Sequence, residues 1–200
     1  MWKYTSPGIP DEQFIRGNIP MTKEEIRVLT LAKARLLADA TVYDVGAGTG
    51  SLTVEMARLV PEGQVFAIER EAEGVTLIKE NCLRFGISNV TVLCGKAPEA
   101  MDNLPKANVI FIGGSGGELA GILDKARACL KPAGRIVINA VTLETLTSAQ
   151  RLLEEKGFEE IEIVSLAVTR WPRKGRSHMA EALNPVFIIS GNIRSVEDGR

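Results

Sequence analysis

The sequence has few of the residues that build disulfide frameworks and metal sites. Its 200 residues include only three cysteines, Cys82, Cys94 and Cys129, and one histidine, His178. The cysteines are odd in number, scattered and without the spacing of zinc ligands, which argues against a disulfide framework and against a metal site. We interpret them as small buried hydrophobic side chains of a protein in the reducing cytoplasm.

The sequence also lacks an excess of charge of either sign and any apolar run long enough to span a membrane. Its formal net charge is −1, without the basic excess of a dedicated nucleic-acid binder. The N-terminus has no basic-then-apolar signal pattern. Because 45% of the residues are hydrophobic, we expect one domain with a substantial core, and neither a nucleic-acid nor a membrane partner.

Three glycines spaced two apart, Gly46, Gly48 and Gly50, follow a short apolar run that predicts a buried strand. Glycine lets the backbone turn tightly and approach a ligand closely. Residues 52–59 have helical spacing, so the amides at the helix start face the glycine loop. A strand, a glycine loop and a helix in this order indicate the nucleotide-binding half of an open parallel sheet.

The spacing around this loop decides between nucleotides. In the dinucleotide fingerprint GxGxxG the third glycine position, counted from Gly46, falls on Ser51. An acid two places before GxGxG, here Asp44, resembles motif I of the class I S-adenosylmethionine-dependent methyltransferases, where it lies near the methionine end of the cofactor. Glu69 ends the next apolar run, where a carboxylate can accept both ribose hydroxyls. We therefore favour S-adenosylmethionine over NAD.

Apolar strands and helical segments alternate along most of the chain, which predicts a parallel sheet with helices on both faces. Two further strands without a helix between them are expected to pair antiparallel at the sheet edge. The expected strands after the glycine loop are 64–69, 90–94, 108–112, 135–139, 160–168 and 184–190, and the expected helices are 23–38, 72–85, 117–130 and 143–156. The methyltransferase resemblance implies a Rossmann-like α/β fold whose seven-stranded, mostly parallel sheet has the order 3-2-1-4-5-7-6.

The two ends of the chain differ from this pattern. Residues 1–20 hold too many glycines and prolines for a long helix, yet enough apolar side chains to pack as an arm on the body or on a neighbouring subunit. Thr22 and Glu25 have the spacing of a capping box at the start of the first helix. We expect a single domain over 1–191 and a flexible tail over 192–200.

The glycine-rich stretch 111–119 is the main candidate for contact with a substrate. It exposes backbone amides before a helix start, which favours anion binding, and Gly114 and Ser115 lie at its centre. Asn139 follows the fifth strand and is either a substrate residue or a helix cap. Ala97 follows the third strand, where its amide either contacts adenine or belongs to an ordinary loop.

The basic segment 169–178 has two interpretations. It is either a solvated loop or an electropositive lid in which Arg170 and Arg173 bind the carboxylates of an acidic substrate. His178 has no carboxylate or cysteine partner nearby in the sequence, so no catalytic base is assigned.

Several motifs together resemble the CbiT-type cobalt-precorrin methyltransferases, which also form the C-terminal half of CobL. They are GIPDEQFIRG, PMTKEEIR, DVGAGTG, APEA, FIGGSGG, NAVTLET and HM before NPVFIIS. PMTKEE and FIGGSGG are the most particular to that family. The match spans nearly the whole chain.

This resemblance implies a specific reaction and a set of cofactor residues. The reaction is methylation of a tetrapyrrole, a precorrin with or without cobalt, at ring carbon 15, with loss of carbon dioxide from the acetate on ring carbon 12, in cobalamin biosynthesis. A homotetramer is implied, and the carbon 5 precorrin methyltransferase is a possible functional partner. The implied cofactor residues are Thr22, Asp44, Gly46, Ala47, Gly48, Thr49, Gly50, Glu69 and Ala97.

Two alternatives remain open from the residues alone. One is a class I methyltransferase that acts on RNA or protein, although a broad basic face or an added RNA-binding domain is not evident. The other is a module that binds S-adenosylmethionine without catalysis.

Overall fold

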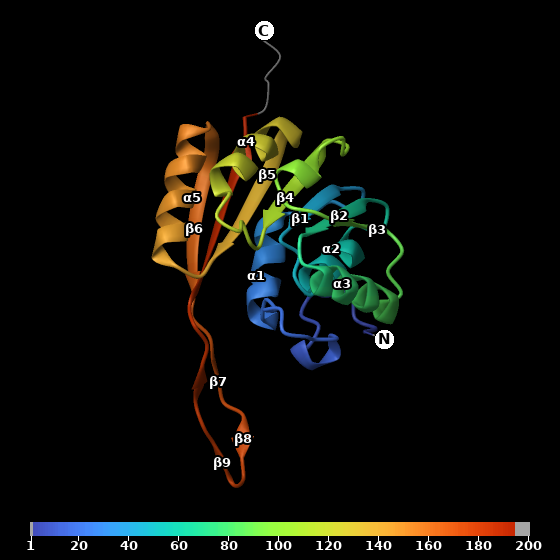
Figure 1. The fold of residues 1–200 in the computed structure, drawn as a ribbon. Helices are drawn as coiled ribbons and strands as arrows, with labels where there is room; N and C mark the ends of the chain where they lie inside the picture. The colour runs from blue at the N-terminus through green and yellow to red at the C-terminus, as the bar shows by residue number, and fades with distance from the viewer. Residues whose placement is uncertain (1, 195–200) are drawn as a thin grey trace.

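The apolar run before the glycine loop forms β1 (Thr41–Val45), which lies inside a seven-stranded sheet (Figure 1). The computed structural model describes residues 2–194. The other strands of the sheet are β2 (Gln64–Glu69), β3 (Val90–Cys94), β4 (Ala107–Ile112), β5 (Leu130–Ala140), β6 (Phe158–Leu166) and β11 (Val186–Ile193). Strands β1 to β5 are parallel, and β11 runs antiparallel between β5 and β6.

The sheet order is β3-β2-β1-β4-β5-β11-β6, which confirms the predicted fold class. The seventh strand of the sheet carries the label β11 because four two-residue strands lie between it and β6. The parallel strands are apolar along nearly their whole length, as expected where helices cover both faces.

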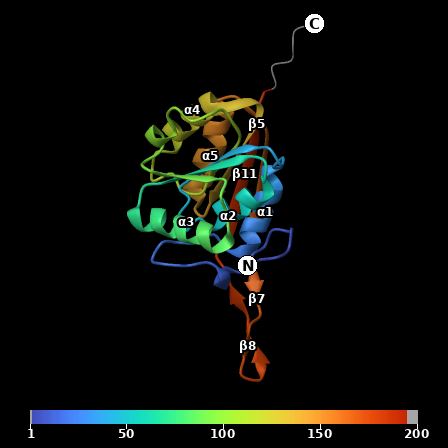
Figure 2. The ribbon, with the colours of Figure 1, turned by 90° about the vertical axis from the view of Figure 1, so that its right-hand side faces the viewer.

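Alternate residues of the strands pack against helices on opposite faces. Val42 and Val65 face a core shared with α1 and α2, whereas Tyr43 and Phe66 face a core shared with α4 and α5. Helix α3 packs beside α2 over β2 (Figure 2). The helices are α1 (Glu24–Ala34), α2 (Ser51–Leu59), α3 (Ala72–Phe85), α4 (Leu119–Cys129) and α5 (Leu143–Glu155), with short 3₁₀ turns at η1 (Asp11–Gln13) and η2 (Glu99–Met101).

The predicted capping box at the start of α1 is wrong. The helix begins at Glu24, and its N-cap residue Lys23 makes no side-chain cap hydrogen bond. The carboxylate of Glu25 instead accepts hydrogen bonds from Arg170 at 2.6 and 2.8 Å, a charge-assisted pair that a backbone amide does not match. The helix also ends early, at Ala34, because Arg35 adopts a left-handed conformation with φ 51°.

A fully buried guanidinium, that of Arg27, ties the N-terminal arm to the body. It binds Asp11 of the arm at 2.8 Å and Glu55 of α2 at 2.7 Å. It also donates to the backbone carbonyl groups of Ile9 and Thr22. Burial raises the pKa of Asp11, but hydrogen bonds from Arg27 and Arg170 outweigh it, so the net pKa is lowered. The arm therefore packs on the body of its own chain.

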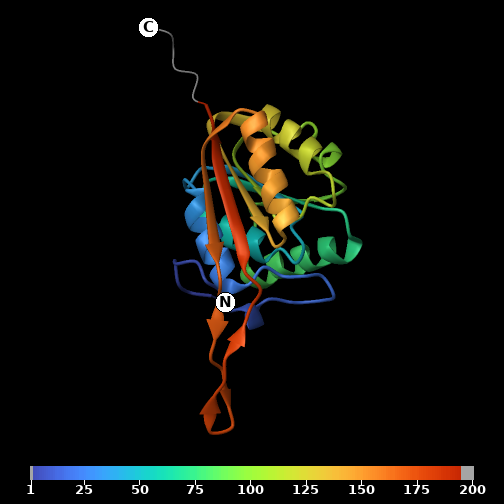
Figure 3. The same ribbon diagram turned by 90° about the vertical axis from the view of Figure 1, so that its left-hand side faces the viewer.

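Residues between β6 and β11 form a thin two-stranded arm that projects away from the sheet (Figure 1, Figure 2 and Figure 3). We call residues 167–185 the hairpin arm. Two antiparallel ladders hold it together, β7 (Thr169–Arg170) with β10 (Glu181–Ala182) and β8 (Arg173–Lys174) with β9 (Ser177–His178). The basic segment is thus an extended arm of paired strands, and its tip does not fold back over the glycine loop of its own chain.

The sheet continues past the residue where we expected a tail to begin. Asn192 and Ile193 are the last residues of β11, and Asn192 pairs with Arg135 and Glu159 in register. The rest of the expected tail, 195–200, lies outside the described residues. Within 2–194, no helix has both the length and the apolar character to cross a membrane.

We predict that Arg27→Met destabilises the protein at pH 7 by about 3–5 kcal/mol, because it leaves the buried Glu55 without its cation and Asp11 with only the longer contact to Arg170. The free energy of unfolding, measured by urea titration, checks this. Because the folded-state pKa of Asp11 is lowered, its contribution is present above its unfolded pKa and is lost as the pH falls through the folded value. The difference between wild type and variant should therefore shrink as the pH falls below about 4.

Arg151→Gln is the matched control, since its pair with Glu155 is exposed on α5. It should change stability by no more than about 0.5 kcal/mol. Equal stability of Arg27→Met and wild type at pH 7 would contradict the role given to the buried guanidinium.

Candidate cofactor and substrate site

The glycine loop forms the floor of the site at the carboxyl ends of the parallel strands. Gly46 and Gly48 have φ of 71° and 57°, and the amides of Gly46 and Ala47 donate to the carbonyl of Ile68 at 2.9 and 3.1 Å. A Cβ at Gly46 would lie 2.5 Å from the carbonyl oxygen of Gly114. Only glycine fits there, because the loop after β4 crosses directly over the loop after β1.

Two adjoining cavities lie above this floor. The first, the Glu69 cavity, has a volume of about 300 Å³ and is also lined by Ala97, Gly114 and Ser115. The second, the Asp44 cavity, has a volume of about 510 Å³. The two share Pro20, Gly46, Gly48 and Gly113. An elongated ligand that crosses the glycine loop would occupy both.

Glu69 holds the glycine loop against the end of β2. One of its carboxylate oxygens accepts from the amide of Gly48 at 2.8 Å, and the other accepts from the amide of Glu71 at 2.9 Å. Each oxygen has a second lone pair, so both can also accept from a ligand hydroxyl. Ala97 lies on the same cavity wall and is buried.

Asp44 is a fully buried acid with unfulfilled hydrogen-bonding capacity. Its Oδ2 accepts from the hydroxyl of Thr53, while its Oδ1 has no partner among the described residues. Burial is the main reason that its pKa is raised to about 7; the Thr53 hydrogen bond opposes the rise and the nearby Glu69 adds to it. The hydroxyl of Thr49 is likewise buried without a partner in the part of the chain that the structure describes. Both line the Asp44 cavity, which indicates a polar ligand group at that point.

Of the remaining predicted cofactor residues, Thr22 and Ala47 line the Asp44 cavity. Gly50 lines neither cavity. It is the N-cap of α2 with φ 74°, and it packs against Ile78 of α3. Its place in the motif is explained by the turn into the helix.

Asn139 stands at the end of β5 and lines the Asp44 cavity. Its side chain exchanges hydrogen bonds with the hydroxyl of Thr30 at 3.1–3.2 Å. Thr142, and not Asn139, caps α5 through a 3.1 Å hydrogen bond to the amide of Thr145. Of the substrate-side candidates, the structure thus brings Asn139, Gly114 and Ser115 to two adjoining cavities.

The two arginines of the basic segment do not join them. The Arg170 guanidinium binds Glu25 at 2.6 Å and Asp11 at 3.1 Å, and these carboxylates raise its pKa. Arg173 is exposed on the hairpin arm, where it donates to the carbonyl of Gly175 at 3.1 Å. In this chain Arg170 is paired with nearby acids and neither arginine lines the two cavities, so their role in binding substrate carboxylates stays a prediction.

Sequence reasoning missed the residues that the hairpin arm contributes at its base. Leu183 and Asn184 of the arm, with Val186 at the start of β11, line the Asp44 cavity beside Asn139. It also missed Thr53, the partner of Asp44, although Thr53 lies on the first turn after the glycine loop, a position that faces the end of β1. No signal in the sequence placed the base of the arm at the site.

Comparisons with known proteins agree with one another and cover nearly the full length of the chain. The family model described as a precorrin methyltransferase domain matches residues 13–191. A probable cobalt-precorrin-6B C(15)-methyltransferase (decarboxylating) of Pyrobaculum calidifontis is 45% identical over 94% of this chain and 97% of the relative.

Two solved structures are also similar. A precorrin-6y C5,15-methyltransferase of Geobacter metallireducens has a TM-score of 0.89 at 40% identity, over 93% of this chain and 98% of the other. A precorrin 8w decarboxylase of Methanobacterium thermoautotrophicum has a TM-score of 0.88 at 37% identity, over 92% of this chain and 100% of the other. The family resemblance inferred from PMTKEE and FIGGSGG is thereby confirmed. The chain belongs to the precorrin methyltransferase family.

Proposed function

We propose that the protein transfers a methyl group from S-adenosylmethionine to ring carbon 15 of a precorrin and releases carbon dioxide from the acetate on ring carbon 12, in cobalamin biosynthesis. The observation that carries this proposal is the 45% identity to a relative of that named activity over almost its entire length. The paired cavities and the buried acids at the carboxyl edge of the sheet support it.

The two cavities suit the two halves of S-adenosylmethionine, which supplies an electrophilic sulfonium methyl when it is bound. Glu69 would accept the ribose hydroxyls, with Ala97 beside the adenine. Asp44 and Thr49 have the orphaned oxygens needed to bind the polar amino-acid end, and Thr22 and Ala47 lie on the same wall. The backbone of Gly46 and Gly48, which lines both cavities, would lie against the middle of the cofactor, and Gly50 shapes the turn.

The protein's chemical contribution is chiefly the positioning of its substrate. The conjugated ring carbon of a precorrin is itself a nucleophile, so the chain needs to hold it in line with the sulfonium methyl. Gly114 and Ser115 offer backbone groups for the substrate's carboxylates. Asn139 lies at the end of β5, on the wall of the Asp44 cavity. Apolar side chains of Phe111, Val141 and Leu183 line the remaining wall. No proton donor is assigned.

The finer features of assembly and location are also proposals. We infer a homotetramer in which the hairpin arm packs on neighbouring copies, because Trp171 and Met179 are 62% and 54% exposed on an arm without a core of its own. The carbon 5 precorrin methyltransferase is the proposed functional partner. Three free cysteines, of which Cys94 is exposed, favour the reducing cytoplasm.

The reaction is tested by incubating the protein with S-adenosylmethionine and a precorrin-type tetrapyrrole, with and without cobalt. Mass spectrometry should show the gain of one methyl group and the loss of one carbon dioxide in the product. Labelled carbon in the ring carbon 12 acetate should appear as carbon dioxide.

An unchanged tetrapyrrole, with S-adenosylmethionine binding demonstrated by calorimetry, would contradict the proposed reaction. Transfer of the methyl group to RNA or protein would then favour the first alternative. Binding without any transfer would favour a non-catalytic module.

Asp44→Asn should weaken S-adenosylmethionine binding by about tenfold or more, since a charged acceptor is lost. It should also stabilise the ligand-free protein above pH 7, because the raised pKa means that ionising this buried acid costs folding free energy. Below the raised pKa the wild-type acid is neutral, so the stability gap should close as the pH falls toward 4. Calorimetry and urea unfolding at several pH values measure the two effects.

Asp39→Asn removes an exposed carboxylate and is the matched control. It should leave cofactor affinity unchanged and produce no such closing gap. A variant at Asp44 with wild-type affinity would show that this acid does not bind the cofactor.

Replacing both Trp171 and Met179 by Asp should shift the protein from a tetramer to smaller species, because charges replace the two exposed apolar side chains of the hairpin arm. Sedimentation velocity measures the change. Leu83→Asp provides the control, since Leu83 is 84% exposed but lies on α3. If the control dissociates the assembly and the arm variant does not, the arm is not the interface.

A further inference from the structure

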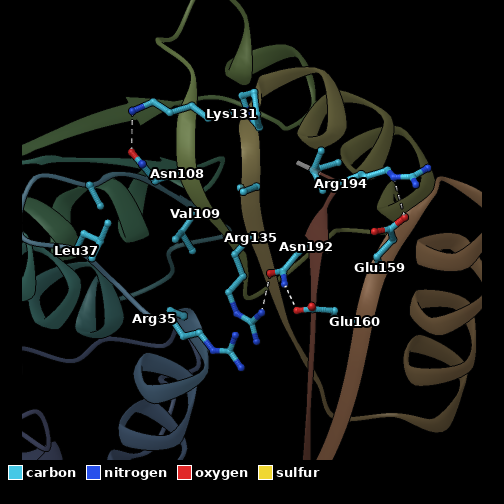
Figure 4. A pocket seen from close by; sticks show the side chains of 16 residues that line it. Arg35, Leu37, Asn108, Val109, Lys131, Arg135, Glu159, Glu160, Asn192 and Arg194 are labelled. Atoms are coloured by element: carbon cyan, nitrogen blue, oxygen red, sulfur yellow. Dashed lines mark hydrogen bonds and ion pairs between the residues drawn. The ribbon is translucent and has the colours of Figure 1, made fainter. Parts of the chain in front are cut away.

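A third cavity opens at the other edge of the sheet, where the parallel strands begin (Figure 4). We call it the Arg135 cavity; its volume is about 390 Å³. Its walls come from the end of α1, the starts of β4, β5 and β6, and the end of β11. It shares no lining residue with the Glu69 or Asp44 cavities. The site of methyl transfer therefore does not account for it.

Arg135 lines this cavity and is 5% exposed. Its guanidinium donates to Asn192 at 2.7 Å, to the hydroxyl of Ser190 at 2.8 Å and to the backbone carbonyl of Lys33. All three acceptors are neutral. Among residues 2–194 no carboxylate oxygen lies within 4 Å of this buried charge. A buried arginine normally has an anionic partner, so this arrangement is unusual.

A second guanidinium adds to the positive charge. Figure 4 shows Arg35, at the end of α1, directed toward Arg135. Burial lowers the pKa of Arg135, and the like charge of Arg35 lowers it further. Lys131 lies on the opposite wall, where its ammonium donates to Asn108 at 2.9 Å. The guanidinium groups of Arg35 and Arg135 thus lie on the same side of the cavity, and the ammonium of Lys131 lies on the other side (Figure 4).

The nearby carboxylates compensate this charge only in part, since Glu162 and Glu160 raise the pKa of Arg135 by less than burial and Arg35 lower it. Glu162 faces the two arginines, but Lys33 binds its carboxylate and lowers its pKa. Glu159 pairs with Arg194 at 3.7 Å on the rim. The carboxylate of Glu160 accepts a hydrogen bond from the side-chain amide of Asn192 at 2.6 Å. Arg35, Arg135 and Lys131 therefore have neutral partners or none within the described chain. Glu160 is the carboxylate of the cavity that likewise has only a neutral partner there.

The backbone around the cavity is strained. Arg35, Ala133 and Glu160 have φ of 51°, 58° and 50°, a left-handed conformation that costs free energy in residues with a Cβ. Among the described non-glycine residues only Asn103 also has a positive φ. Such strain clusters at ligand sites, where the surrounding structure holds side chains in a required position. Here all three of these residues line the Arg135 cavity.

We propose that the Arg135 cavity binds a small ligand that carries a phosphate or carboxylate group, held by Arg35 and Arg135 with Lys131 on the far wall. A guanidinium pair matches the planar, bidentate geometry of these oxyanions. The volume is in the range of small-molecule sites and exceeds what a single ion requires. This binding is independent of the proposed methyl transfer.

The experiment titrates the full chain with inorganic phosphate and, separately, with succinate, at constant ionic strength held by chloride. Isothermal calorimetry should show saturable binding of at least one probe. Arg35→Gln and Lys131→Gln should each weaken it by about tenfold or more, because each removes one charge-assisted contact. Arg35 is exposed, so its loss should leave the circular dichroism and thermal unfolding intact.

Arg151→Gln is the matched control, since it removes the same kind of charge from exposed α5. It should bind the probes as the wild type does. Tighter binding of phosphate would identify a phosphate-bearing ligand, and tighter binding of succinate a carboxylate-bearing one. The proposal is overturned if neither probe saturates, or if Arg35→Gln binds both as tightly as the wild type.

Discussion

The buried guanidinium of Arg27 is the interaction on which the shape of the site depends. It joins Asp11 of the N-terminal arm to Glu55 of α2, and it donates hydrogen bonds to the carbonyl groups of Ile9 and Thr22. This pairing offsets the desolvation of the buried ions, which costs on the order of several kcal/mol per ion. The arm is consequently held where Pro20 borders both the Glu69 and the Asp44 cavities. A buried interaction whose guanidinium lines neither cavity thus holds one wall of the site in place.

Local patterns in the sequence were sufficient to predict the strands of the sheet, whereas their order was predicted from the resemblance to class I methyltransferases. Apolar runs separated by helical spacing determine which segments become parallel strands, and the two last strands without a helix between them had to pair antiparallel. The acids at the ends of β1 and β2 were predictable for the same reason. Residues at the end of a parallel strand lie at the carboxyl edge of the sheet. The positions of Asp44 and Glu69 in adjoining cavities therefore do not depend on the conformation of the loops.

The misplaced predictions concern residues whose partners are remote in the sequence. Thr22 and Glu25 have the spacing of a capping box, but Glu25 binds Arg170, which lies 145 positions away. The sequence shows that residues 169–178 are basic, but it does not show which acidic residues lie beside them in the fold. The ion pairs of Arg170 were therefore not predictable. The base of the hairpin arm reaches the site for a similar reason. Its position depends on the register in which β6 and β11 pair, which local sequence does not encode.

The insertion of β11 between β5 and β6 has a consequence for the order in which the chain acquires its structure. During synthesis β5 and β6 emerge first, yet neither pairs with the other in the sheet. Each must wait with an unpaired edge until residues 186–193 follow, after the whole hairpin arm. Exposed strand edges are prone to wrong pairing. The last sheet strand to be synthesised is therefore the one that closes off two aggregation-prone edges at once.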